Sequence, residues 1–322
     1  MSKPRVIVTR RWPAAVEEAL STRFDAQLNT DDRPFSREEL AAALRGADAL
    51  CPTVTDAIGG DLFGSGVRAR VIANYGVGYN HIDVDAARNH GIVVTNTPDV
   101  LTDCTADLAM TLMLMCARRV GEGERELRAG DWTGWRPSHL VGSRVTGRTL
   151  GIVGMGRIGQ ATARRARHGF GMRIACYSRS PVPQTVLDEL QAHQVSDLDE
   201  LAASVDFLSL HCPATPETHH LIDRRRLALM RRTAFLINGS RGPLVDEQAL
   251  ADALANGRLA GAGLDVYEAE PTVCDELLEL DNVVLLPHMG SSTAETRNAM
   301  GMRVVENLDR FFAGEEPPDI CV

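Results

Sequence analysis

The sequence has little that would serve a disulfide framework, a metal centre or a membrane span. Its seven cysteines form no CxxC pair, which is typical of reduced, mostly buried thiols in a cytoplasm, so we expect no metal site. The longest apolar run, residues 108–117, is far shorter than the roughly 20 residues that a membrane-spanning helix needs. The first residues, MSKPRVIVTRRW, are expected to hold a first strand rather than a signal peptide. We therefore expect a cytoplasmic protein without a membrane partner.

An excess of basic residues is also lacking. The chain has 34 lysines and arginines against 43 acidic residues, a net charge of −9. Such a balance gives no basic surface for phosphate backbones, so no nucleic-acid partner is expected. Two short arginine runs, at 224–226 and 231–232, flank an apolar helical stretch and are interpreted as solvated helix ends. The length of 322 residues, with 44% hydrophobic and 24% charged residues, favours a globular protein of two domains.

Short β-branched runs alternate with segments of helical length along the chain. This alternation predicts parallel strands joined by helices, and hence an α/β protein of two Rossmann-like, doubly wound domains. Strands of a first unit are expected at 5–8, 47–51, 69–76 and 91–96. A second unit is expected to contribute six strands, in the segments TLGIVG, MRIACYS, VDFLSLH, TAFLING, LAGAGLDV and NVVLLPH.

Two helical stretches suggest how these units are connected. Residues 98–130 form a long segment with helical periodicity and Thr or Asp start signals. The stretch TAETRNAMGMRVVENLDRFFAG is also helical and could return to the first unit. The first domain would then be discontinuous, formed by residues 1–99 and 290–322, with a dinucleotide-binding domain at 100–289 between them.

The turn GMGRIG at residues 154–159 has the pattern of a dinucleotide-binding loop. It follows a strand-like segment and precedes a helical stretch that is expected to end at Gly169. Gly154 would make the tight turn, Gly156 would let the backbone approach a pyrophosphate, and Gly159 would let helix pack on strand. The N–H groups at the helix start would hold the phosphate. The alternative is an ordinary strand-turn-helix.

A second glycine loop, NYGVGYNHID at residues 74–83, also lies between a strand and a helix, whose expected cap is Asp83. It lacks the full GxGxxG pattern of a dinucleotide-binding loop. Its free amides could bind a small anion such as a carboxylate. A glycine-permitted turn without a ligand is the alternative.

Seven segments between residues 74 and 293 together resemble the D-2-hydroxyacid dehydrogenase family, particularly its glyoxylate and hydroxypyruvate reductase branch. They are NYGVGYNHID, NTPDVLTDCTADLAMTLML, GRTLGIVGMGRIGQ, LHCPATPETHHLID, LINGSRGPLVDEQAL, AGAGLDVYEAEP and LLPHMGSST. The resemblance implies a substrate-binding domain made from both chain ends, a central nicotinamide domain, and an active site in the cleft between them. It also implies a homodimer built partly from the helical segment after Asn96.

The resemblance implies three catalytic residues: Arg241 on the substrate, His288 as proton donor and Glu270 as partner of His288. The chemistry agrees, because hydride transfer to a ketone builds negative charge on oxygen and needs both a proton donor and a nearby cation. A histidine paired with a carboxylate is held protonated toward neutral pH, and an arginine fork matches a planar 2-oxo acid. Glu268 is a rival for Glu270, but it does not precede Pro271.

Other positions follow from the same resemblance. The amides of Val77 and Gly78 match the holders of the substrate carboxylate, and Asp265 matches the residue that orients the nicotinamide carboxamide. Trp135 matches a tryptophan that reaches the neighbouring subunit's active site, although a buried aromatic at the dimer contact is an equal alternative. Pro213 would lie beside the adenine. The expected cofactor-binding set is Thr102, Gly154, Gly156, Arg157, Ile158, Gly159, Ser178, Arg179, Ser180, Pro213, Asn238, Gly239, Ser240, Asp265, His288 and Gly290.

Relatives with other substrates fit the sequence less well. A phosphoglycerate dehydrogenase often carries a further regulatory domain, a formate dehydrogenase would have Gln at position 270, and a D-lactate dehydrogenase usually has a ribose-binding Asp. A 2-ketogluconate reductase, or a reductase of another 2-oxo acid from the same family, is the alternative function. From a different class, a nicotinamide-sensing co-repressor also uses this fold, but no peptide-binding extension or partner motif points to it.

The segment ACYSRS at residues 175–180 lies where an NAD-binding protein usually places an Asp or Glu on the ribose 2′-hydroxyl. An acid would repel a 2′-phosphate, whereas Ser178, Arg179 and Ser180 offer hydroxyl donors and a permanent cation. We therefore expect NADP(H) to be preferred, with NAD(H) possible. An exposed loop arginine without a ligand is the alternative for Arg179.

Overall fold

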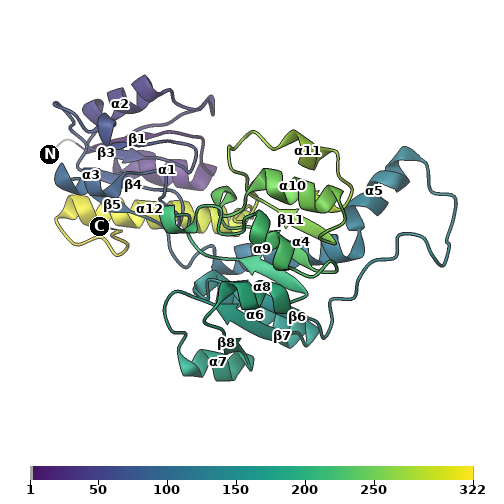
Figure 1. Ribbon diagram of the computed structural model, residues 1–322. Coiled ribbons are helices and arrows are strands. Elements are labelled where there is room, and N and C mark those ends of the chain that lie inside the picture. The colour runs from purple at the N-terminus through teal and green to yellow at the C-terminus, as the bar shows by residue number, and fades with distance from the viewer. Residues whose placement is uncertain (1–2, 322) are drawn as a thin grey trace. The chain divides into compact units, whose positions relative to one another are not determined.

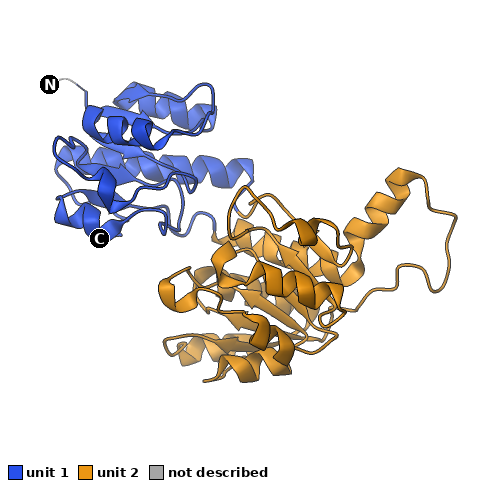
Figure 2. Cartoon of the chain, turned by 45° about the horizontal axis from the view of Figure 1, so that its top comes forward, with its two compact units in different colours: residues 1–101, 291–322 blue, residues 102–290 orange. Residues whose placement is uncertain are grey.

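The computed structural model describes residues 3–321. The chain forms two compact units, one made of Met1–Leu101 with Ser291–Val322 and the other of Thr102–Gly290 (Figure 2). Among the described residues, no helix is both long and apolar enough to cross a membrane.

Unit 1 is built on a five-stranded parallel sheet in the order β2-β1-β3-β4-β5. The three central strands are buried along most of their length, as their apolar sequences predict. The elements are β1 (Arg5–Val8), α1 (Ala14–Arg23), β2 (Asp25–Gln27), α2 (Arg37–Gly46), β3 (Ala49–Cys51), η1 (Gly60–Leu62), β4 (Val71–Ala73), α3 (Val84–Asn89), β5 (Val93–Thr95) and α12 (Ala294–Ala313).

Helix α12 belongs to unit 1 although it follows unit 2 in the sequence (Figure 1). It begins after Thr293, whose hydroxyl accepts the N–H of Thr296, and ends at Gly314 in a left-handed conformation. It packs on α1 so closely that a Cβ on Gly301 would lie 2.6 Å from the methyl groups of Val16. Only glycine allows this approach of the two helices.

Unit 2 is built on a seven-stranded parallel sheet in the order β12-β11-β10-β9-β6-β7-β8. Strand β6 lies inside the sheet and the chain turns from one side of it to the other, which is the switch point of a doubly wound sheet. The elements are α4 (Thr102–Arg118), α5 (Val120–Ala129), β6 (Thr149–Val153), α6 (Arg157–Phe170), β7 (Arg173–Tyr177), α7 (Gln184–Leu190), β8 (His193–Gln194), α8 (Leu198–Ser204), β9 (Phe207–Leu210), η2 (Pro216–Thr218), α9 (Arg224–Leu229), β10 (Phe235–Asn238), η3 (Gly242–Leu244), α10 (Glu247–Ala255), β11 (Gly261–Leu264), α11 (Asp275–Leu278) and β12 (Val283–Leu285).

Successive residues of the central strands of unit 2 supply two separate cores. Phe207 and Phe235 stack with ring centroids 5.0 Å apart, in a core that also contains residues of α4 and α6. Leu208 and Leu236 point to the opposite face and pack with residues of α8, α9 and α10. The continuous apolar runs of these strands are thus explained by burial on both faces, as in other parallel sheets.

Three details of the helices and strands differ from the sequence-based prediction. The segment 98–130 is not one helix, because Arg119 adopts a left-handed conformation (φ 53°) that separates α4 from α5. Helix α6 does not end at Gly169 but one residue later, at Phe170, where Gly171 provides the left-handed cap. The short edge strands β2 and β8 were not predicted, since two or three residues carry too little pattern.

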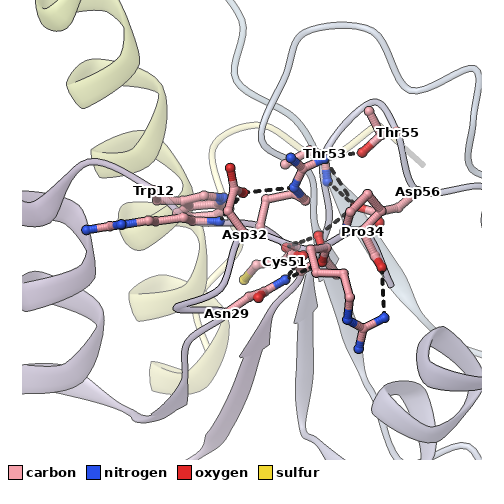
Figure 3. A network of polar contacts seen from close by, with 12 residues as sticks. Trp12, Asn29, Asp32, Pro34, Cys51, Thr53, Thr55 and Asp56 are labelled. Atoms are coloured by element: carbon pink, nitrogen blue, oxygen red, sulfur yellow. Dashed lines mark hydrogen bonds and ion pairs between the residues drawn. The ribbon is translucent and has the colours of Figure 1, made fainter. Parts of the chain in front are cut away.

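The loop after β3 is held by a buried carboxylate (Figure 3). The Asp56 side chain is only 2% exposed. Its Oδ2 accepts hydrogen bonds from the Thr9 hydroxyl at 2.6 Å and from the Thr53 N–H at 2.7 Å. The Thr53 hydroxyl lies 3.0 Å from that of Thr55. One carboxylate therefore ties the end of β1 to the turn that follows β3.

We expect Asp56→Ala to lower the free energy of unfolding by about 1–3 kcal/mol, because the partly buried Thr53 amide would lose its acceptor and the buried Thr9 hydroxyl would keep only the longer bond to the Cys51 carbonyl. Urea unfolding followed by circular dichroism measures the change. Asp31→Ala is the matched control, since Asp31 is exposed. A loss no larger in Asp56→Ala than in the control would contradict this role of the carboxylate.

Candidate active site

The polar residues that follow three neighbouring strands of unit 2 lie at one edge of its sheet. Arg241 comes three residues after β10, Asp265 directly follows β11, and His288 comes three residues after β12. Strands β10, β11 and β12 are adjacent and parallel. Their carboxyl ends therefore meet at the edge where doubly wound sheets bind ligands.

His288 and Glu270 form a pair at this edge. The His288 Nδ1 lies 2.8 Å from the Glu270 Oε2, and each side chain is 32% exposed. His288 has a φ of 53°, a left-handed conformation that is uncommon outside glycine and asparagine. Its N–H donates to the Asp265 carbonyl at 2.9 Å. With Nδ1 directed to the carboxylate, Nε2 is the ring nitrogen that can face a substrate.

The environment keeps Glu270 ionised. Burial raises the pKa of the Glu270 carboxyl, but four effects outweigh it: the hydrogen bond and charge of His288, the Tyr267 N–H and the charge of Arg241. The net shift of the Glu270 pKa is downward. A lowered carboxyl pKa preserves the negative partner of His288 over the physiological pH range.

Asp265 fixes the backbone that follows His288. Asp265 is fully buried, and its two carboxylate oxygens accept the N–H groups of Met289 at 2.6 Å and Gly290 at 2.8 Å. Burial raises the pKa of this carboxyl, while the two amides and the charge of His288 act against that rise. The sequence alone assigned Asp265 to the cofactor and gave no sign of this role in holding the His288 turn.

Tyr267 is a structural residue of the site that the sequence did not reveal. Its hydroxyl donates to the Leu286 carbonyl at 2.8 Å, and its N–H donates to the Glu270 Oε1 at 3.1 Å. One residue thus links the loop after β11 to the end of β12. In the sequence, Tyr267 is only an aromatic residue within the segment DVYEAEP, and nothing in that segment predicts its two hydrogen bonds.

Arg241 is placed by a turn packed tightly against the loop that carries Glu270. The Asn238 side-chain amide donates to the Arg241 carbonyl at 2.9 Å, and Arg241 Nη1 donates to the Ser240 carbonyl at 2.6 Å. A Cβ on the next residue, Gly242, would lie 1.9 Å from the Tyr267 carbonyl. Burial lowers the pKa of the Arg241 guanidinium, and the charge of Glu270 opposes this. At physiological pH, Arg241 remains a cation.

The rival carboxylate, Glu268, has other partners. Its Oε1 accepts the Glu247 N–H at 2.8 Å, and its Oε2 lies 3.0 Å from the His220 Nε2. The structure therefore joins Glu270 to His288 and Glu268 to His220.

The glycine-rich turn has the backbone geometry of a dinucleotide loop. Gly154 has a φ of 95°, and a Cβ there would lie 2.8 Å from the Cys212 N. A Cβ on Gly159 would lie 2.2 Å from the Gly154 carbonyl oxygen, whereas one on Gly156 would meet open space. Gly156 caps α6, whose first N–H groups, at Arg157 and Ile158, begin the helix. These residues fit a pyrophosphate at a helix start.

The remaining residues expected at the cofactor follow strands of the same sheet, apart from Thr102. The Ser178 hydroxyl, after β7, accepts the Met155 N–H at 2.7 Å and so contacts the glycine-rich turn. Arg179 and Ser180 follow it and are exposed. Pro213 comes after β9, and its carbonyl accepts the Thr218 hydroxyl at 2.8 Å. Thr102 is the first residue of α4, and Gly239, Ser240 and Gly290 follow β10 or β12.

In unit 1, the loop after β4 turns its carbonyls inward. The Asn74 side-chain amide donates to the carbonyls of Gly76 and Gly78, each at 3.0 Å, and Asn96 donates to the Val77 carbonyl at 2.7 Å. Within residues 3–321, the amides of Val77 and Gly78 are not among the donors of backbone hydrogen bonds. Asp83 caps α3 by accepting the Ala86 N–H. This arrangement suits an anion-binding loop.

Trp135 lies in the long connection between α5 and β6, and 82% of it is exposed. Helix α5 and this connection stand away from the rest of unit 2 (Figure 2). Other apolar side chains of the same segment are also largely exposed: Val120, Leu127, Trp132 and Val141. This segment therefore presents several apolar side chains to solvent.

Comparison with known proteins places these features in a family. Residues 110–290 match the family described as D-isomer specific 2-hydroxyacid dehydrogenase, NAD binding domain. A glyoxylate reductase of Thermococcus kodakarensis is 47% identical over 322 residues, which cover 99% of this chain and 96% of that protein. A glyoxylate reductase of Pyrococcus horikoshii is 45% identical with the same coverage of both chains.

Solved structures agree with this match. An NADPH-dependent glyoxylate/hydroxypyruvate reductase of Sinorhizobium meliloti, solved with NADP and malonate, has a TM-score of 0.86 and 36% identity, covering 100% of this chain and 97% of that one. A protein of Thermus thermophilus has a TM-score of 0.90 and 45% identity, covering 99% and 100%. The predicted α/β fold and the predicted resemblance are confirmed. The chain therefore belongs to the D-isomer specific 2-hydroxyacid dehydrogenase family and is an NAD(P)-dependent oxidoreductase.

Proposed function

We propose that the protein is an NADPH-preferring reductase of small 2-oxo acids that converts glyoxylate to glycolate and hydroxypyruvate to the D-2-hydroxy acid. The observation that carries this proposal is the 2.8 Å pair of His288 and Glu270, with the charge of the partly buried Arg241 acting on Glu270, in a chain 47% identical to a glyoxylate reductase. Following the oxidation of NADPH with glyoxylate and with hydroxypyruvate tests it. Intact cofactor binding without turnover of any 2-oxo acid would instead favour a nicotinamide-sensing role.

In this proposal Arg241, His288 and Glu270 have different roles. Arg241 binds the carboxylate and the keto oxygen of the substrate and balances the charge that grows on that oxygen. His288 gives the proton from Nε2 to the same oxygen, and Glu270 stabilises the protonated ring through Nδ1. The nicotinamide supplies the hydride when it is bound. Tyr267 and Asp265 act through the others by holding the Glu270 loop and the His288 turn in place.

The substrate carboxylate would be held by the amides of Val77 and Gly78. Since three successive carbonyls of that loop accept hydrogen bonds, its amides are the groups left to face an anion. We accordingly assign substrate binding to residues 1–99 and 290–322, and dinucleotide binding to residues 100–289.

The preference for NADPH is proposed from the loop after β7. Ser178 is held against the glycine-rich turn, so the next residues would lie near the ribose of a dinucleotide bound there. No carboxylate occupies positions 178–180, and Arg179 can pair with a 2′-phosphate. The Sinorhizobium meliloti structure named above contains NADP.

We also propose a homodimer. Helix α5 and the connection after it carry exposed Leu127, Trp132 and Trp135, with exposed fractions of 61%, 52% and 82%. A second copy of the chain would cover this surface, and Trp135 would then reach the active site of the partner.

The proton-donor role predicts a large loss of turnover in His288→Asn. Asparagine tolerates the left-handed backbone at this position, so the ring is removed with little strain. We expect kcat/KM to fall by about 10²–10⁴-fold, while NADPH binding, measured by fluorescence titration, stays within a few-fold. His193→Asn on exposed β8 is the control. Turnover within a few-fold of the parent would remove His288 from this role.

The pairing of His288 with Glu270 predicts a change in the pH profile of reduction in Glu270→Gln. Because the folded-state pKa of Glu270 is lowered, its charge and the stabilising ion pair are present above the ordinary carboxyl range and lost only as pH falls through the lowered pKa. Gln has no such charge. The kcat/KM of the variant should therefore fall below that of the parent over the range in which Glu270 is ionised in the parent. We would measure kcat/KM of both proteins from about pH 5 to 10, a range that includes the ordinary titration of histidine. Superimposable profiles of the parent and of Glu270→Gln would contradict the pairing.

The cofactor assignment predicts that Arg179→Ala weakens the use of NADPH selectively. Loss of one charge-assisted hydrogen bond should reduce kcat/KM for NADPH by about tenfold or more, with that for NADH unchanged within about twofold. Arg173→Ala is the matched control, because Arg173 is an exposed arginine at the opposite end of β7. Equal efficiency of the parent protein with both cofactors would contradict the proposed preference.

A further inference from the structure

A second group of histidine and carboxylate side chains lies in unit 2, apart from the His288 pair. His219, His220 and Glu268 each present one ligand atom, and the three atoms all lie within 4.8 Å of one another. The two histidines follow η2, whereas Glu268 lies in the loop after β11. Because His220 and Glu268 are 48 residues apart in the sequence, no spacing motif announces the group.

The backbone brings the two adjacent imidazoles to one side. Neighbouring side chains of an extended chain point to opposite faces. Here His220 adopts a left-handed conformation with a φ of 48°, and the two rings stack with centroids 4.0 Å apart and planes 26° apart. The His220 N–H donates to the Pro243 carbonyl at 2.8 Å, which holds this turn. A left-handed conformation of a non-glycine residue persists only where its surroundings impose it.

The carboxylate of the group is also oriented by its neighbours. The Glu268 Oε1 accepts the Glu247 N–H at 2.8 Å, and the Glu268 N–H donates to the Glu247 carboxylate. This reciprocal pair leaves Oε2 directed at the His220 Nε2, 3.0 Å away. The side chains of His220 and Glu268 are 33% and 30% exposed, and His219 is exposed. The group is therefore open to an ion from solvent while two of its ligands are held.

We propose that His219, His220 and Glu268 form a Zn²⁺ site with an open position for water. Two imidazoles and one carboxylate are a ligand set that suits Zn²⁺ better than Mg²⁺ or Ca²⁺, which prefer oxygen. Zinc holds such ligands at about 2.0–2.2 Å, so ligand atoms around one ion lie within about 4 Å of each other. The three ligand atoms lie within 4.8 Å of one another, so binding would require the exposed His219 side chain to move closer to the other two. The Glu247 N–H on Glu268 is the kind of outer hydrogen bond that orients a metal ligand.

The proposed ion lies beside the loop after β11, which carries Glu270, and takes no part in the reaction. Glu268 directly follows Tyr267, whose N–H donates to Glu270. Zinc bound to the folded chain would stabilise the segment that joins these residues, since an ion that binds only the folded state raises its stability. This site was not expected from the sequence, because the cysteine spacing does not indicate a metal site.

Isothermal titration of the tag-free, chelator-treated full chain with ZnCl₂ tests the proposal. We expect one binding event that weakens by about tenfold or more in both His219→Ala and Glu268→Gln. His219→Ala changes an exposed side chain and is the variant least able to disturb folding. His193→Ala, which removes another exposed histidine of unit 2, should bind zinc as the parent does.

Thermal unfolding gives a second reading that does not depend on activity. Zinc should raise the unfolding temperature of the parent and of His193→Ala but not that of His219→Ala. Absence of zinc binding in the parent would overturn the proposal. Equal affinity in the parent, His219→Ala and Glu268→Gln would also overturn it, because the ion would then lie elsewhere, for example at thiols or at His288.

Discussion

The edge of the unit 2 sheet that carries His288 depends on a single buried carboxylate. Asp265 is fully buried, and both of its oxygens accept backbone amides, those of Met289 and Gly290. A buried carboxylate is costly unless it is hydrogen-bonded in this way. The two bonds join the end of β11 to the turn after β12 and hold His288 in its left-handed conformation. With the turn fixed, the imidazole keeps its Nδ1 on Glu270.

The features that sequence reasoning could predict are those carried by local pattern. The alternating strands and helices, the turn at Gly154 and the cap at Asp83 each depend on residues close together in the chain. His288 and Glu270 were predicted only because their segments resemble those of a family. Their role in the reaction remains a proposal, although the structure places the two side chains in contact.

What the sequence could not reveal depends on contacts between distant segments. The close packing of Gly242 on Tyr267 depends on the register of β10 and β11, and the contact of Glu268 with His220 depends also on that of β9 and β10. No local pattern encodes these registers. The left-handed break at Arg119 was missed because helical periodicity continues on both sides of it. Edge strands β2 and β8 exist only through pairing with their neighbours.

The central claim is that this edge reduces a small 2-oxo acid to one stereoisomer of the 2-hydroxy acid. The most direct measurement is chiral analysis of the glycerate formed from hydroxypyruvate and NADPH by the purified parent protein. The account predicts D-glycerate alone, because Arg241 and His288 hold the keto group in one orientation to the hydride donor. Formation of L-glycerate, a mixture of both isomers, or no glycerate would contradict it.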